Sequence, residues 1–160
     1  MDRLWTPWRM EYIVDDKKEE GCVFCAAFES KEDAKNTVLV RREKSFLVLN
    51  RYPYSNGHLL AVPNRHVSGL IDLDHEELLD LFLGVREAQC ICQKALNPHG
   101  FNIGINIGAV AGAGLPGHLH VHIVPRWQGD SNFMPVVGKT KVLPETLASS
   151  YKKLLQKISG

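Results

Sequence analysis

The alternation of apolar and polar residues predicts two groups of strands, separated by one long helix. The runs before the helix are rich in β-branched residues, and charged residues between the first two fit a hairpin turn. The runs after it alternate apolar with small or polar residues, and the last is expected to end at Pro125. The predicted strands cover residues 37–40, 45–50 and 58–62 before the helix, and 101–107 and 118–124 after it.

The long helix has clear signals at both ends. Asp74 and Glu77 form an acidic capping box at its start, and Asn97-Pro98 ends it. Its apolar residues recur at helical spacing and predict one core-facing stripe: Leu78, Leu81, Phe82, Val85, Ala88, Cys92 and Ala95. A second helix is predicted over residues 144–158, with its own inward-facing residues: Leu147, Tyr151, Leu154, Leu155 and Ile158.

Strands on both sides of one long helix favour an α+β fold. We expect an antiparallel β-sheet with the long helix packed on one face, plus a C-terminal helix. A chain of 160 residues fits a single domain over residues 1–160, with residues 1–21 as an N-terminal arm. The polar stretch 28–36 is expected to be a loop or a short helix.

Composition narrows the classes of function. Nineteen basic and 18 acidic residues give a net charge of +1, which argues against bulk electrostatic capture of nucleic acid. The chain has neither a signal-peptide pattern nor an apolar run long enough to span a membrane, so we expect a soluble, cytoplasmic protein. In that compartment the four cysteines are expected to be thiols or metal ligands rather than disulfides.

The most informative segment is the predicted strand that begins at His118. Successive side chains of a strand point to opposite faces, so three histidines share one face and three aliphatic residues share the core-facing one. The histidines are His118, His120 and His122, and the aliphatic residues are Leu119, Val121 and Ile123. A slip of one residue would bury the imidazoles and expose the aliphatic side chains, so the pattern fixes the register.

Adjacent imidazoles repel one another when protonated, which favours the neutral form with a ring nitrogen lone pair. Such a nitrogen can attack phosphorus or bind a metal. The loop at residues 108–117 holds four glycines, whose backbone N–H groups suit phosphate oxygens. Spacing alone does not separate a phosphate-attacking site from a three-histidine zinc site, and three histidines on an exposed sheet face are the third alternative.

The segment His118–Arg126, HLHVHIVPR, resembles the signature of the histidine triad (HIT) family. The agreement extends to residues 50–58 and 63–66, and to Asn106 with the glycine loop. The start LWTPWRMEYI and the tail GDSNFMPVVGKTKVLPETL resemble the bacterial diadenosine tetraphosphate phosphorylase branch of the family. The resemblance therefore covers nearly the whole chain.

The resemblance implies catalytic roles at matching positions. His120 matches the nucleophile that forms a covalent nucleotidyl-histidine intermediate. His122 would position the ring of His120 and keep its attacking tautomer. His118 would contact the phosphates or bind zinc, and His58 would approach the α-phosphate.

It also implies a nucleotide-binding set. Asn50 would hold the ribose hydroxyls, while Asn106 and the backbone of the glycine loop, including Gly112, Gly114 and Gly117, would cradle the phosphates. Trp127 would line the adenine pocket or a subunit contact. Many family members have a glutamine in the loop before the triad, but here the loop reads AGAGLPG, so we expect backbone rather than side-chain contact with the phosphates.

Cys22 and Cys25 form a CxxC pair. Two ordinary loop thiols are one reading, and a redox pair is another, although no thioredoxin-like βαβ pattern surrounds them. A structural zinc site needs about four ligands. The family resemblance implies that His66 and His118 complete a structural zinc site with the two cysteines, anchoring the arm to the catalytic strand.

The expected activity is phosphorolysis of diadenosine tetraphosphate to ADP and ATP. The rivals are hydrolysis of dinucleoside polyphosphates or nucleoside phosphoramidates, a nucleotide-binding module without turnover, and a zinc hydrolase using all three histidines. The expected partner is a small adenine dinucleoside polyphosphate. The resemblance implies a homodimer, or a homotetramer through the N-terminal arm.

Overall fold

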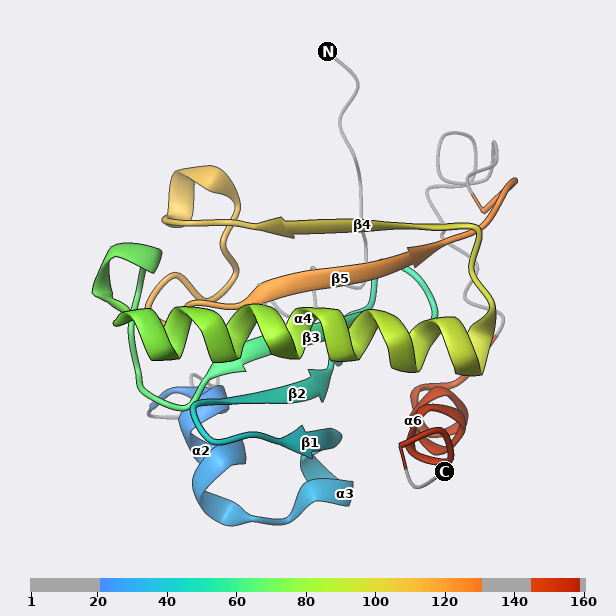
Figure 1. The fold of residues 1–160 in the computed structure, drawn as a ribbon, viewed down its shortest axis with the longest axis horizontal. Helices are drawn as coiled ribbons and strands as arrows, with labels where there is room; N and C mark the ends of the chain where they lie inside the picture. The colour runs from blue at the N-terminus through green and yellow to red at the C-terminus, as the bar shows by residue number, and fades with distance from the viewer. Residues whose placement is uncertain (1–20, 131–144, 159–160) are drawn as a thin grey trace.

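The computed structural model describes residues 21–130 and 145–158. Predictions that fall on the N-terminal arm, and on most of the tail that resembles the phosphorylase branch, lie outside the described residues. Five antiparallel strands form one sheet in the order β1-β2-β3-β5-β4 (Figure 1). The strands are β1 Val38–Arg41, β2 Ser45–Leu49, β3 Leu59–Pro63, β4 Gly100–Ile105 and β5 Val121–Arg126.

Helices pack on both faces of this sheet. The helical segments are α2 Val23–Ser30, α3 Asp33–Asn36, η1 Leu70–Asp72, α4 His75–Leu96, η2 Ala109–Ala111 and α6 Leu147–Leu155. The larger apolar cluster joins α4 and α6 to one face of the sheet, and Leu119, Val121 and Ile123 all belong to it. A smaller cluster places Phe24 and Ala27 of α2 on the opposite face. The predicted antiparallel sheet with a long helix on one face is therefore confirmed.

The long helix α4 begins as predicted. The backbone N–H of Glu77 donates to the Asp74 carboxylate (2.8 Å), and the N–H of Asp74 donates to the Glu77 carboxylate (2.9 Å). The guanidinium of Arg65 also donates to the Glu77 carboxylate. This bond is the largest cause, and the bond from the Asp74 N–H the second largest, of a pKa of Glu77 lowered to about 2. No helix among residues 21–130 and 145–158 is long and apolar enough to cross a membrane.

The apolar stripe of α4 differs in part from the prediction. Leu81, Val85, Ala88 and Cys92 are buried as expected, but Leu78 and Phe82 are 38% and 46% exposed. Gly84 and Ile91 take their place in the buried face. The predicted apolar stripe covers more of the helix surface than the sheet contacts, so residues at the margin of the stripe remain exposed. Leu155, predicted to face inward on α6, is likewise 39% exposed.

The triad strand also differs from its predicted bounds. β5 begins at Val121 because the preceding residues pair with the loop after β3: the N–H of Leu119 donates to the carbonyl of Val67 (2.6 Å). β5 then continues through Pro125 instead of ending there. Pairing with β3 stops at Ile123, so the missing N–H of the proline removes no ladder bond on that side.

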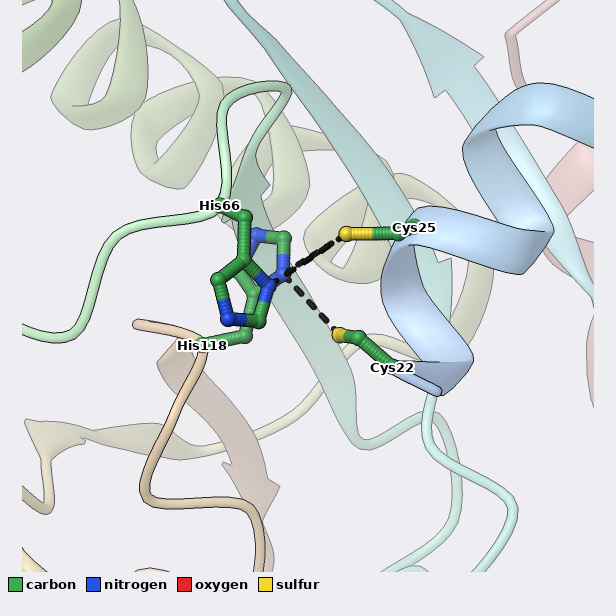
Figure 2. A group of neighbouring side chains, drawn as sticks. All are labelled: Cys22, Cys25, His66 and His118. Atoms are coloured by element: carbon green, nitrogen blue, oxygen red, sulfur yellow. Dashed lines mark hydrogen bonds between the residues drawn. The ribbon is translucent and has the colours of Figure 1, made fainter. Parts of the chain in front are cut away.

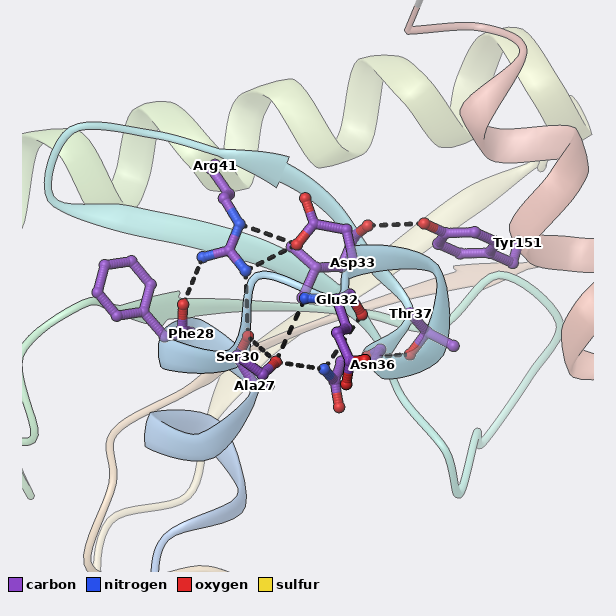
Figure 3. A network of polar contacts seen from close by, with 10 residues as sticks. Ala27, Phe28, Ser30, Glu32, Asp33, Asn36, Thr37, Arg41 and Tyr151 are labelled. Carbon is purple, nitrogen blue, oxygen red and sulfur yellow. Dashed lines mark hydrogen bonds and ion pairs between the residues drawn. The ribbon is translucent and has the colours of Figure 1, made fainter.

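The helix α2 was not predicted from sequence. Arg41, at the end of β1, holds the last turn of α2 by donating to the carbonyls of Ala27 (3.1 Å) and Phe28 (2.8 Å). The guanidinium of Arg41 also forms an ion pair with Asp33 (Figure 3). On the other side of β1, the Tyr151 hydroxyl of α6 donates to the carbonyl of Val38 (2.8 Å). Edge strand β1 thus anchors both α2 and α6.

Asp74→Ala should lower the free energy of unfolding by about 1 kcal/mol, because one N-terminal N–H of α4 loses its capping oxygen. Chemical denaturation followed by circular dichroism measures this change. The matched control is His75→Ala, an exposed position in the same turn, which should stay within about 0.5 kcal/mol of the parent. Equal losses in the two variants would contradict the capping role.

Candidate active site and metal centre

The histidine face of the sheet forms a compact site. His122 projects from the start of β5, His118 and His120 lie just before that strand, and His58 precedes β3. His58, His118 and His120 are only 0%, 2% and 6% exposed. Burial lowers the pKa of both His118 and His120, because desolvation disfavours the charged imidazolium. These two imidazoles are therefore favoured in the neutral form, with burial rather than mutual repulsion as the main cause.

The tautomer of His120 follows from one backbone contact. Its Nδ1 lies 2.8 Å from the carbonyl oxygen of His118. A carbonyl oxygen only accepts, so Nδ1 carries the proton and Nε2 keeps its lone pair. We expected His122 to keep this tautomer; in the structure the His118 carbonyl does so. The ring of His122 packs against that of His120 at a centroid distance of 4.9 Å, in a T-shaped arrangement.

A second chain of contacts fixes the other two rings. The backbone N–H of Tyr54 donates to Nδ1 of His58 (3.0 Å), so the proton of His58 is on Nε2. That nitrogen lies 3.0 Å from Nδ1 of His122 and donates to it. The proton of His122 is consequently on Nε2. The prediction placed His58 beside the α-phosphate, but this fully buried ring contacts His122 instead.

His118 is turned away from the other two triad rings, towards a cluster of metal-ligating side chains. Its Nε2 donates to the carbonyl of Pro63 (3.0 Å), which leaves the Nδ1 lone pair facing the sulfur of Cys22 at 3.1 Å. Cys25 Sγ lies 3.4 Å from Nδ1 of His66 and 3.6 Å from Nδ1 of His118. Figure 2 shows the four side chains converging from α2, the loop after β3 and the segment before β5.

These four residues fit a metal ion by their donor chemistry. One ligand atom from each of Cys22, Cys25, His66 and His118 lies within 4.8 Å of the others. Two sulfurs and two imidazole nitrogens form a donor set typical of structural zinc. The Pro63 carbonyl supplies the outer hydrogen bond that orients a metal-bound imidazole. Burial and the adjacent Cys22 raise the pKa of the Cys25 thiol to about 11, which disfavours the thiolate that binds a metal. A cation between the two sulfurs would favour the thiolate and offset this effect.

Phe24 connects the cysteine pair to the histidine face. It lies between Cys22 and Cys25 in sequence, is 7% exposed, and contacts the rings of His118 and His120 at centroid distances of 5.4 and 5.3 Å. Sequence reasoning missed both Phe24 and Tyr54. The position of Phe24 between two candidate ligands was a signal that was available; the Tyr54 contact is through its backbone and leaves no mark in the side-chain pattern.

Of the predicted nucleotide-binding residues, Asn50 and Gly117 lie next to histidines of this site. Asn50 Nδ2 lies 3.3 Å from Nδ1 of His58, which brings Asn50 into the histidine cluster. Gly117 lies beside His66, since a Cβ there would be 3.7 Å from its Nε2. Gly112 ends η2 with φ of 86°, a left-handed conformation that favours glycine. Asn106 directly follows β4, and exposed Gly114 lies in the same loop. Trp127 follows the far end of β5, away from His118.

The hydrogen bonds above assign the tautomers of His58, His120 and His122. Nitrogen-15 chemical shifts of the imidazoles at neutral pH should show a protonated Nδ1 at His120 and a protonated Nε2 at both His58 and His122. Exposed His75 serves as the reference signal in the same spectrum. Protonation of Nε2 at His120 would contradict the assignment.

Comparison with known proteins agrees with this geometry. The HIT domain family model matches residues 31–129. The chain is 40% identical over 161 residues to the AP-4-A phosphorylase of Mycobacterium tuberculosis, covering 96% of this chain and 83% of that protein. It is 41% identical over 101 residues to the asymmetrical bis(5'-nucleosyl)-tetraphosphatase of Schizosaccharomyces pombe, covering 63% and 55% of the two chains.

Solved structures show the same fold. A Zn-bound histidine triad family protein from Mycobacterium smegmatis superposes with a TM-score of 0.71 at 26% identity, covering 87% of this chain and 94% of that one. A hypothetical histidine triad nucleotide-binding protein from Sulfolobus tokodaii gives a TM-score of 0.70 at 28% identity, covering 86% and 92%. The family match spans more than half of the chain and includes the whole triad, so the chain belongs to the histidine triad (HIT) family.

Proposed function

We propose that this protein splits diadenosine tetraphosphate by phosphorolysis, through a covalent nucleotidyl intermediate on His120. The observation that supports this best is the hydrogen bond from Nδ1 of His120 to the His118 carbonyl, which aims a neutral Nε2 lone pair away from the backbone. The relatives named for AP-4-A phosphorylase and for a tetraphosphatase support the substrate class.

The reaction consists of two displacements at the same phosphorus atom. In the first, Nε2 of His120 attacks the α-phosphorus, the bond from that phosphorus to the bridging oxygen breaks, and ATP leaves. In the second, an oxygen of inorganic phosphate attacks the phosphorus, the N–P bond breaks, and ADP leaves with His120 restored. Two smaller barriers replace one large one. His58 donates to Nδ1 of His122 and so keeps the proton of His122 on Nε2. This Nε2–H donates to the phosphate oxygens that gain negative charge in each step.

The surrounding residues would hold the nucleotide in line with His120. In this proposal Asn50 binds the ribose hydroxyls, and Asn106 with the backbone of Gly112, Gly114 and Gly117 binds the phosphates. Trp127 contributes to the adenine pocket or to a subunit contact.

We propose that the metal of the Cys22, Cys25, His66 and His118 cluster is zinc, with a structural role. The donor set and the Zn-bound relative support this assignment. A bound ion would tie the start of α2 to the segment that holds the triad. Since His118 contributes both a ligand nitrogen and the carbonyl that orients His120, the ion would keep that carbonyl in place.

We also propose a cytoplasmic homodimer. β4 is at one end of the strand order, and its apolar residue Ile103 is 45% exposed, with Ile107 just beyond it at 48%. Leu79 and Phe82 on the outer side of α4 are 61% and 46% exposed. An edge strand with neighbouring exposed apolar side chains is suited to pairing with a second copy. The two candidate thiolate ligands fit a reducing compartment.

A product assay tests the reaction. With diadenosine tetraphosphate and inorganic phosphate, chromatography should show ADP and ATP in equal amounts, and formation of ADP should depend on phosphate. His120→Gly should lower kcat by about 10³-fold or more, because the variant lacks the attacking nitrogen. Formation of AMP and ATP without phosphate would replace the proposal with hydrolysis. Activity that survives His120→Gly but is abolished by a chelator would indicate a zinc hydrolase instead.

The metal assignment is tested by elemental analysis and thermal denaturation. The Cys22→Ser, Cys25→Ser double variant should purify with little zinc and a lower melting temperature, because α2 loses its link to the His118 segment. Cys90→Ser is the matched control, since Cys90 is exposed on α4, and it should change neither property. Full zinc loading of the double variant would refute the site.

A further inference from the structure

The histidine face is closed on one side of β5 and open on the other. In the register of the sheet, His122 has Leu60 of β3 as its partner on one side and Gly104 of β4 on the other. Leu60 is 5% exposed and packs in the apolar cluster beneath α2 together with Phe24. Gly104 is exposed and has no side chain. Among the described residues, the side of β5 that is open to a ligand approaching the imidazoles is therefore the β4 side.

The backbone does not explain the glycine at this position. Gly104 lies within a regular strand and is not among the glycines with positive φ, so an ordinary residue fits its conformation. Glycine weakens a strand relative to other residues, because it has no side chain to pack. A Cβ built on Gly104 would meet no described atom within 4 Å. Among the residues that the structure describes, no neighbouring atom therefore requires a glycine at position 104.

The space that Gly104 leaves lies beside the reacting group. Directly paired residues of antiparallel strands have Cβ atoms about 4.5–5.5 Å apart, so a side chain at 104 would project next to the ring of His122. The neighbours of Gly104 on the same face are polar: Asn102 is within β4, and Asn106 follows the strand. Asn102 accepts a hydrogen bond from Arg126 through its Oδ1 (2.6 Å), which leaves its amide N–H groups available. Uncharged amides suit an anionic chain.

We propose that Gly104 is a specificity-determining residue that keeps a passage open for the leaving part of the substrate. This rests on the proposed nucleotidyl transfer at His120. The ligand that uses the passage is the polyphosphate chain with its distal nucleoside, which continues past His122 and over Gly104. A nucleoside monophosphate ends at His120 and does not enter the passage.

Binding measurements separate these two ligands. We would use the full chain carrying His120→Asn, which prevents turnover, and measure affinities for AMP and for diadenosine tetraphosphate by calorimetry. Adding Gly104→Leu should lower the affinity for diadenosine tetraphosphate by about tenfold or more. The affinity for AMP should stay within about twofold of the parent value, because only the longer ligand meets the new side chain. Gly104→Ala should give a smaller change in the same direction.

Gly100→Leu is the matched control. Gly100 lies on the same face of β4, pairs with Arg126, and likewise has no described atom within 4 Å of the position that a Cβ would take, but it is four residues from Gly104. It should change neither affinity, and circular dichroism should show all variants folded. The proposal would be wrong if Gly104→Leu lowered the affinity for both ligands equally, or lowered the affinity for neither. If the His120→Asn parent bound neither ligand, the proposed function itself would fail.

Discussion

The hydrogen bond between Nδ1 of His120 and the backbone carbonyl of His118 is the contact on which the chemistry of this site depends. It holds the proton on Nδ1, so that Nε2, the nitrogen that attacks in the proposed reaction, keeps its lone pair without a charged partner. Burial lowers the pKa of His120 and outweighs the bond to the His118 carbonyl, which raises it. A carboxylate in the place of the carbonyl would add a negative charge and favour the imidazolium. In the proposed reaction, the nucleophile is thus prepared by backbone geometry and burial.

His118 connects this nucleophile to the rest of the molecule. Its Nε2 is bonded to the Pro63 carbonyl, its Nδ1 faces the cysteine sulfurs, and its own carbonyl orients His120. A shift of α2 or of the loop that bears His66 would therefore be expected to displace His118, and with it the carbonyl that sets the tautomer of His120. Phe24 reinforces the connection by packing on both rings. The four candidate metal ligands and the histidine face are connected through His118 and Phe24, although their side chains come from distant parts of the sequence.

Much of this could be predicted from sequence where the signal is local. The two-residue alternation around His118 placed three aliphatic residues in the core, and the Asp74–Glu77 pair located the start of α4. Long-range contacts were not available in the same way. The margins of the α4 stripe, the continuation of β5 through Pro125 and the helix α2 depend on which neighbours the sheet supplies. The tautomer of His120 depends on a backbone carbonyl, which no residue type reveals.

The most direct test of the central claim is to locate the covalent intermediate. The enzyme would be mixed with diadenosine tetraphosphate without inorganic phosphate, quenched rapidly in alkali, digested, and analysed by mass spectrometry of the peptide that contains residues 118–122. We predict a nucleotidyl group on His120 and none on its two neighbours, with its disappearance on addition of phosphate. A nucleotidyl group on His118 or His122, or turnover with no modified peptide at any time, would contradict the account.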